Sequence, residues 1–212
     1  MILVTGGSGS GKSEYAEQLI LGFGKARRFY VATMEVFGEE GRRKVERHRS
    51  LRKTKGFITI EQPKEIGAIC LVKFGKNPQN QPPQSDCCEE KTAVLLECIM
   101  NLAANEMFSD PFWTSWDNAR EAEDFEEGRN RIHLLAKRIE QEVCSLEKQA
   151  DFLVVVTGEV GEDGCEYSEE TMAYIRLMEE VNRRLAARSE QVWLVTCGIG
   201  VNLKGEETKP WI

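Results

Sequence analysis

Histidine is scarce in this chain, long apolar runs are missing, and acidic residues outnumber basic ones. The 212 residues include two histidines, 28 lysines and arginines, and 35 aspartates and glutamates, which gives a formal net charge of −7. An acidic chain does not fit a general nucleic-acid binder, whose affinity comes from clustered positive side chains. No stretch approaches the roughly 20 apolar residues that cross a bilayer, so we expect no membrane span.

Paired cysteine motifs are missing as well. The seven cysteines show neither a Cys-x-x-Cys spacing nor a histidine at zinc-finger distance. The chain starts with an apolar, strand-like run, without the basic region and cleavage site of a secretory signal. We therefore expect reduced thiols in a cytoplasmic protein.

Short apolar segments rich in β-branched residues predict the strands of a central sheet. Several are apolar almost throughout, which is typical of parallel strands covered by helices on both faces. Helical periodicity is clearest over 168–188 and is also present over 120–148. This alternation predicts a single α/β domain over 1–212, with three layers and a mostly parallel sheet. The predicted strands are 2–4, 29–32, 57–60, 93–96, 152–156 and 192–195.

Two segments interrupt the pattern. Residues 76–91 contain Asn, Gln, Ser and three prolines, a composition that predicts a long exposed loop. Residues 108–125 are also predicted to be irregular. Their Trp113 and Trp116 either cover a ligand or pack beneath a loop or at a subunit interface.

The most specific motif is GGSGSGKS, which follows the first predicted strand and precedes a helical segment. Its glycines allow backbone N–H groups to surround phosphate, and the helix N-terminus adds a positive dipole end. Lys12 is expected to reach the β- and γ-phosphates and to act in catalysis, while Ser13 is expected to bind Mg²⁺. Together with the strand-helix alternation, the motif predicts that the three-layer fold is P-loop NTPase-like. It predicts a GTP or ATP site made of Gly6, Gly7, Ser8, Gly9, Ser10, Gly11, Lys12 and Ser13.

Glu97 and the two histidines are the other candidates for chemistry. Glu97 ends a predicted strand, and it is either a second Mg²⁺ ligand or an ordinary solvated residue or helix cap. His48 lies within the basic segment 42–53, where neighbouring cations leave the neutral imidazole able to attack phosphorus. The alternative for His48 is a solvated, charged helix face. His133 fits a packing or surface histidine.

The order of these segments resembles the bifunctional adenosylcobinamide kinase and adenosylcobinamide-phosphate guanylyltransferase family of cobalamin biosynthesis. The resemblance spans most of the chain through MILVTGGSGSGKS, FYVAT, the ERH segment at His48, LLECI at Glu97, VVVTGEVG, VNRRLA and QVWLVTCGIGV. It implies that GTP or ATP phosphorylates adenosylcobinamide, and that GMP then passes from GTP through a GMP-histidine intermediate to give adenosylcobinamide-GDP. It also implies a homotrimer with a corrinoid as second substrate.

The resemblance identifies His48 as the nucleophile that takes GMP from GTP. It also implies nucleotide contacts at Ala32, Thr33, Met34, Arg49, Ser50, Leu51, Arg52, Glu61 and Glu97. Two readings compete with the bifunctional enzyme: a P-loop kinase of another small molecule, and a degenerate nucleotide-binding protein without turnover.

The chain departs from the family pattern in its C-terminal third. Gly158 stands where the family usually has asparagine, Glu166-Tyr167 replace a Val-Pro pair, and residues 173–177 replace an Arg-x-Phe-Arg-Asp run. The P-loop, His48 and Glu97 match the pattern. The departures therefore concern corrinoid binding, one of the two activities or an intersubunit site more than nucleotide use.

Overall fold

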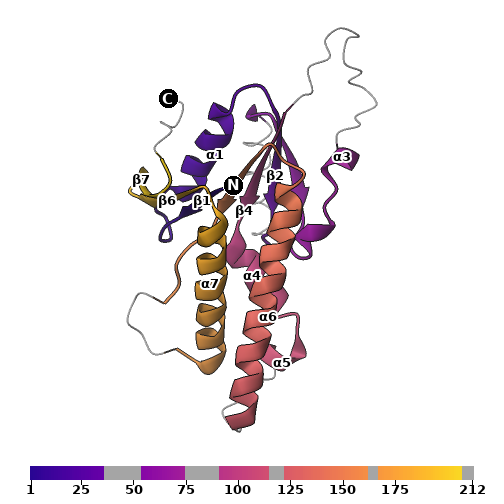
Figure 1. The fold of residues 1–212 in the computed structure, drawn as a ribbon, viewed down its shortest axis with the longest axis vertical. Coiled ribbons are helices and arrows are strands. Elements are labelled where there is room, and N and C mark those ends of the chain that lie inside the picture. Colours follow the sequence, from indigo (N-terminus) through magenta and orange to yellow (C-terminus); the bar gives the residue numbers. More distant parts are fainter. Residues whose placement is uncertain (36–53, 75–90, 115–121, 162–166, 207–212) are drawn as a thin grey trace.

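The computed structural model of the chain describes residues 1–35, 54–74, 91–114, 122–161 and 167–206 (Figure 1). Several predictions lie outside these residues. They concern His48, the segment 49–52, Trp116, Glu166 and all but the last residue of the loop 76–91.

A seven-stranded sheet forms the centre of the molecule, in the order β3-β2-β4-β5-β1-β6-β7. Its first six strands in this order pair in parallel, and β7 pairs antiparallel with β6. The six predicted strands are confirmed, as is the mostly parallel α/β fold. The strands are β1 Ile2–Thr5, β2 Arg27–Ala32, β3 Phe57–Glu61, β4 Thr92–Glu97, β5 Phe152–Val156, β6 Gln191–Thr196 and β7 Ile199–Lys204.

Helices cover both faces of the sheet (Figure 1). Alternate strand residues point to opposite faces, so Ile2 and Val4 pack with α1 while Leu3 faces the layer of α4, α6 and α7. The two apolar cores give the predicted three layers. The helices are α1 Lys12–Gly22, α3 Leu71–Phe74, α4 Ile99–Met107, α5 Pro111–Thr114, α6 Ala122–Glu147 and α7 Glu169–Arg188, with a short 3-10 helix η1 at Ile66–Ala68.

The predicted helices over 168–188 and 120–148 are confirmed as α7 and α6. At the start of α7, the Ser168 hydroxyl accepts a hydrogen bond from Thr171 N at 3.3 Å, and two acidic residues follow in the first turn. The two helices lie side by side (Figure 1), where Arg184 of α7 pairs with Glu140 of α6 at 3.0 Å. Within the described part of the chain, none of the helices has the length and apolar character needed to span a membrane.

Two elements differ from the prediction. Residues 108–125, expected to be irregular, contain α5 and the first turn of α6. Trp113 of α5 is only 2% exposed, and its ring packs edge-on against Phe112 at 4.9 Å, so it serves in packing. The edge strand β7 was not predicted. Its side chains at Ile199, Val201 and Leu203 are exposed, so they lack the burial expected of an apolar strand.

Candidate nucleotide-binding site

The loop between β1 and α1 is shaped by its glycines. Gly6 is buried, and a Cβ added there would collide with the carbonyl oxygen of Val195 and approach the Ser10 hydroxyl. Gly11 has φ +88°, in the left-handed region that side chains disfavour, and the helix begins at the next residue. The local sequence therefore forces a tight turn immediately before a helix N-terminus, as the motif predicts.

Two contacts hold this loop in place. The Lys12 ammonium folds back over the loop and donates to the Gly7 carbonyl oxygen at 2.9 Å. From the other side, the backbone N–H of Gly198 donates to the Ser10 carbonyl oxygen at 2.8 Å. Gly198 lies in the turn between β6 and β7, so the unpredicted hairpin supports the loop. A positive side chain and a helix N-terminus thus converge at one end of the sheet, which suits a phosphate group.

Glu97 reaches the loop from the end of β4. Its Oε1 accepts a hydrogen bond from the Ser13 hydroxyl, and its Oε2 accepts one from the Tyr30 hydroxyl at 2.8 Å. The structure therefore brings together the two residues predicted to bind Mg²⁺. A carboxylate beside a hydroxyl is the oxygen donor set that Mg²⁺ takes in phosphate-transfer sites, so these residues fit the ion.

The other predicted contacts lie along the same edge of the sheet. Ala32 at the end of β2 is in register with Glu61 on one side and Glu97 on the other. Glu61 is exposed, and Met34 is 39% exposed. These residues form a row that leads from the phosphate loop, residues 6–13, toward β3. This edge is formed by the carboxyl ends of parallel strands, which is where α/β proteins bind ligands.

Thr33 has a supporting position. Its side chain is buried, and its hydroxyl accepts from Cys98 N and donates to the Cys98 carbonyl oxygen, each at 2.8 Å. The Asn105 amide, from α4, donates to the carbonyl oxygens of Thr33 at 2.8 Å and Pro63 at 3.1 Å. Asn105 thereby joins the loops that follow β2 and β3. The sequence analysis missed it, because a polar residue in a helix is by itself no signal for a particular partner.

Buried groups near Glu97 are kept neutral. Burial raises the pKa of the Cys98 thiol, and the neighbouring Glu97 charge adds to the effect. Burial also raises the pKa of Tyr174 to about 12, and its hydroxyl donates to the Met100 carbonyl oxygen at 2.9 Å. His133 lies elsewhere, on the surface of α6, with 61% of its side chain exposed. Of the two predicted alternatives, a packing histidine and a surface histidine, the second is confirmed.

The loop after β5 is held by an amide that the sequence analysis missed. Asn182 of α7 accepts a hydrogen bond from the Thr157 hydroxyl at 2.6 Å and donates to the Gly158 carbonyl oxygen at 3.0 Å. A side chain at Gly158 would meet the Met100 sulfur and the Gly6 carbonyl oxygen. The backbone at Gly158 is thus close to the phosphate loop. The Asn182 amide supports this backbone, although Gly158 itself lacks the amide side chain that the family usually has there.

Known proteins are similar to this chain over almost its whole length. The family described as cobinamide kinase / cobinamide phosphate guanyltransferase matches residues 2–203. The chain is 29% identical over 204 residues to a protein of Escherichia coli (strain K12) named bifunctional adenosylcobalamin biosynthesis protein CobU, covering 96% of this chain and 99% of that protein. It is also 29% identical over 210 residues to the protein of the same name from Salmonella typhimurium, with the same coverage.

Proposed function

The chain belongs to the cobinamide kinase / cobinamide phosphate guanyltransferase family, and from this we propose that it is a bifunctional enzyme of cobalamin biosynthesis with both activities. In the first reaction it phosphorylates adenosylcobinamide with GTP or ATP. In the second it transfers GMP from GTP to the new phosphate, which gives adenosylcobinamide-GDP. The observation that carries the proposal is the contact between Ser13 and Glu97 at the start of α1, where Lys12 folds back over the glycine-rich loop.

In the kinase step, the acceptor hydroxyl oxygen attacks the γ-phosphorus and loses its proton to solvent. The bond to the β–γ bridging oxygen breaks, and the nucleoside diphosphate leaves. Lys12 lies at the phosphate loop, where its ammonium would neutralise charge on the β- and γ-phosphates. Mg²⁺ held by Ser13 and Glu97 would neutralise further phosphate charge. Tyr30 orients the Glu97 carboxylate through its hydrogen bond.

In the guanylyl step, a ring nitrogen of His48 attacks the α-phosphorus of GTP, and pyrophosphate leaves with the α–β bridging oxygen. A phosphate oxygen of adenosylcobinamide phosphate then attacks the same phosphorus, the P–N bond breaks, and the imidazole is regenerated. The covalent intermediate divides one difficult transfer into two displacements. The basic segment 42–53 supports this role for His48. We assign the contacts at 49–52, Met34 and Glu61 to the nucleotide in this step.

The test is covalent labelling. The purified protein is incubated with α-labelled GTP and Mg²⁺, then denatured. We expect label that survives alkali and is lost in acid, as for a phosphoramidate. It should be absent from His48→Ala but present in His133→Ala, the matched control because His133 is the chain's other histidine and is exposed.

Failure of this test has a clear meaning. A folded, GTP-binding protein that takes up no label would exclude the guanylyl-histidine step and leave the kinase or the degenerate nucleotide-binding protein. Equal labelling of His48→Ala would exclude His48 as the nucleophile.

We propose further that the protein is a cytoplasmic homotrimer. The family resemblance supports this, and the row of exposed apolar side chains on β7, Ile199, Val201 and Leu203, suits a surface covered by another copy. Light scattering of the purified protein should give three times the chain mass of 24.0 kDa, and a monomer would contradict the proposal.

A further inference from the structure

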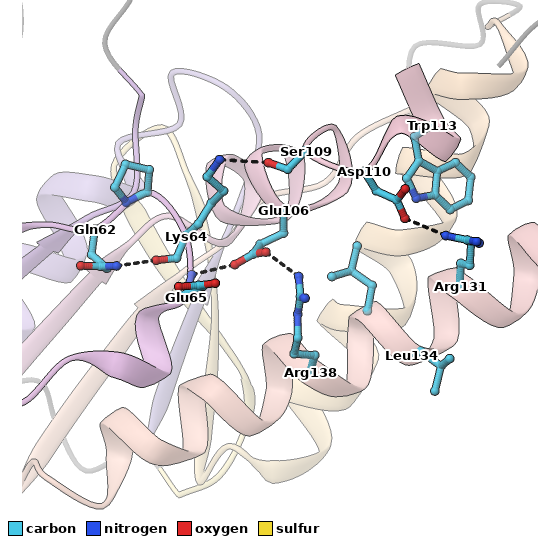
Figure 2. Close-up of a pocket in the computed structure, with 12 residues that line it drawn as sticks. Gln62, Lys64, Glu65, Glu106, Ser109, Asp110, Trp113, Arg131, Leu134 and Arg138 are labelled. Atoms are coloured by element: carbon cyan, nitrogen blue, oxygen red, sulfur yellow. Dashed lines mark hydrogen bonds and ion pairs between the residues drawn. The ribbon is translucent and has the colours of Figure 1, made fainter. Parts of the chain in front are cut away.

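A cavity of about 770 Å³ lies next to the row of predicted nucleotide contacts (Figure 2). One wall is the loop 62–65, which directly follows Glu61 of β3. The other walls are the end of α4 with the start of α5, and one face of α6. A volume of this size is typical of a small-molecule site, and neither the phosphate loop nor Glu97 lines it.

Polar pairs span the rim of this cavity (Figure 2). The Lys64 ammonium donates to the Ser109 hydroxyl at 3.0 Å, and Arg131 pairs with Asp110 at 2.8 Å. On the wall formed by α6, Arg138 pairs with the buried carboxylate of Glu106 from α4. Cations and carboxylates are equal in number among the lining residues, so the cavity as a whole is close to neutral.

The remaining lining residues are largely apolar. They include Pro63, Leu134 and Leu135. A neutral site with apolar surface and paired donors and acceptors is poorly suited to phosphate, which favours net positive charge. It suits carboxamides, because each primary amide donates through its NH₂ group and accepts through its carbonyl oxygen. Cobinamide is a cobalt-containing corrin macrocycle whose rim carries such amides.

The position of the cavity fits an acceptor substrate. The carboxyl ends of β3 and β4 are separated by two strand spacings, because β2 lies between them, and this corresponds to about 10 Å. The cavity lies at the end of β3, and Glu97 lies at the end of β4. The hydroxyl of cobinamide is at the tip of a flexible amide-linked arm, so a macrocycle in the cavity leaves the arm free to extend toward Ser13 and Glu97.

We propose that this cavity binds the amide-bearing rim of cobinamide and of cobinamide phosphate. The inference rests on the proposed function, because that function supplies the corrinoid. Lys64, Arg131 and Asp110 at the rim exchange hydrogen bonds with the amides, and Pro63 and Leu135 contact the macrocycle. The site is separate from the phosphate loop, so filling it blocks the corrinoid and leaves the reaction of GTP with the protein intact.

Ser109 offers a matched pair of variants for the test. Ser109→Trp places an indole in the cavity from an exposed position, whereas Ser109→Ala removes the same hydroxyl and fills nothing. Binding of cobinamide is measured by equilibrium dialysis, using its visible absorbance, and covalent label from α-labelled GTP is measured on the same samples. We expect Ser109→Trp to raise the Kd for cobinamide at least tenfold and Ser109→Ala to change it less than twofold, with labelling of both variants within twofold of wild type.

The outcomes separate this inference from the proposed function. Unchanged corrinoid binding in Ser109→Trp overturns the inference, and loss of GMP labelling together with corrinoid binding overturns it by assigning the cavity to the nucleotide. A third outcome is that the wild type takes no label from GTP, but binds cobinamide and loses this binding in Ser109→Trp. That result supports the inference and refutes the guanylyl step. If Ser109→Trp does not fold, Leu134→Trp introduces the ring from α6, at a side chain that is 64% exposed, with the same criteria.

Discussion

At the scale of single residues, the two hydrogen bonds of Glu97 place its carboxylate where it can bind Mg²⁺. Its carboxylate accepts from Ser13 on one oxygen and from Tyr30 on the other. Glu97→Gln removes the negative charge with little change in shape, so we expect Mg²⁺-dependent turnover to fall by about 100-fold, as for loss of one electrostatic contact in a transfer site. Nucleotide binding measured in EDTA should change only a few-fold.

Tyr30→Phe is the matched control for this prediction. It removes one hydrogen bond to Glu97 and leaves the charge, and one such bond is worth about 0.5–1.5 kcal/mol. Turnover should therefore fall less than about tenfold, as measured by steady-state kinetics over a Mg²⁺ titration. Equal losses in the two variants would contradict a metal-binding role for the carboxylate.

Two adjacent glycines of the phosphate loop differ in what surrounds them. A Cβ at Gly6 would collide with the Val195 carbonyl oxygen, whereas a Cβ at Gly7 would have no atom within 4 Å. We expect Gly6→Ala to lower the free energy of unfolding by about 2 kcal/mol or more and Gly7→Ala by less than about 1 kcal/mol. Urea unfolding without nucleotide measures both, and similar losses would show that the loop does not pack against β6 in this way.

At the scale of elements, α4 joins the loops at the carboxyl edge of the sheet. Asn105 donates to Thr33 and Pro63, which follow β2 and β3. Asn105→Ala leaves both carbonyl oxygens without this donor, which costs about 1–3 kcal/mol. The loop after β2 carries Met34, and the loop after β3 follows Glu61. We therefore expect the KM for GTP to rise about tenfold while kcat changes less. Steady-state kinetics would check the KM, and unfolding measurements would check the loss of stability.

Asn202→Ala is the control for Asn105→Ala, which removes the amide that forms the brace between the loops after β2 and β3. Asn202 lies in β7, and its amide donates to the Gly205 carbonyl oxygen just after that strand at 3.3 Å. The variant therefore also loses an amide hydrogen bond, but one in which α4 takes no part. Its KM for GTP should stay within twofold of wild type. A rise in KM equal to that of Asn105→Ala would mean that general destabilisation, and not the loop connection, causes the effect.

At the scale of the whole molecule, the nucleotide site combines segments from both ends of the chain. Residues 6–13, Glu97 and Gly198 meet only in the folded state, so bound nucleotide stabilises the fold. At a free concentration 100 times its Kd, Mg-GTP should add about 2.7 kcal/mol. For a domain of this size that corresponds to a rise in Tm of roughly 5–10 °C.

Thermal unfolding with and without Mg-GTP tests this expectation. Lys12→Ala should lose most of the rise in Tm, since the ammonium at the phosphate loop is removed. Lys137→Ala, which removes an exposed lysine of α6, should retain it. A full rise in Lys12→Ala would show that GTP binds elsewhere.

Much of the fold was accessible from the sequence because its signals are local. The six parallel strands were predicted from short apolar runs, and α7 was predicted from its periodicity. The phosphate loop occupies eight consecutive residues, so its motif is complete in the sequence. The edge strand β7 was missed although Ile199, Val201 and Leu203 alternate with other residue types, because the segment is short and contains Gly200, whose position faces the Tyr15 ring.

The sequence by itself therefore determined the parallel strands, the main helices and the phosphate loop, whose causes lie within a few neighbouring residues. Only the tertiary structure decided what Glu97 contacts, because Ser13 and Tyr30 lie 84 and 67 residues away along the chain. It also decided the brace at Asn105 and the cavity beside β3, since their walls come from separate elements. Such contacts depend on how strands are ordered and helices pack, and no local pattern of residues records that order.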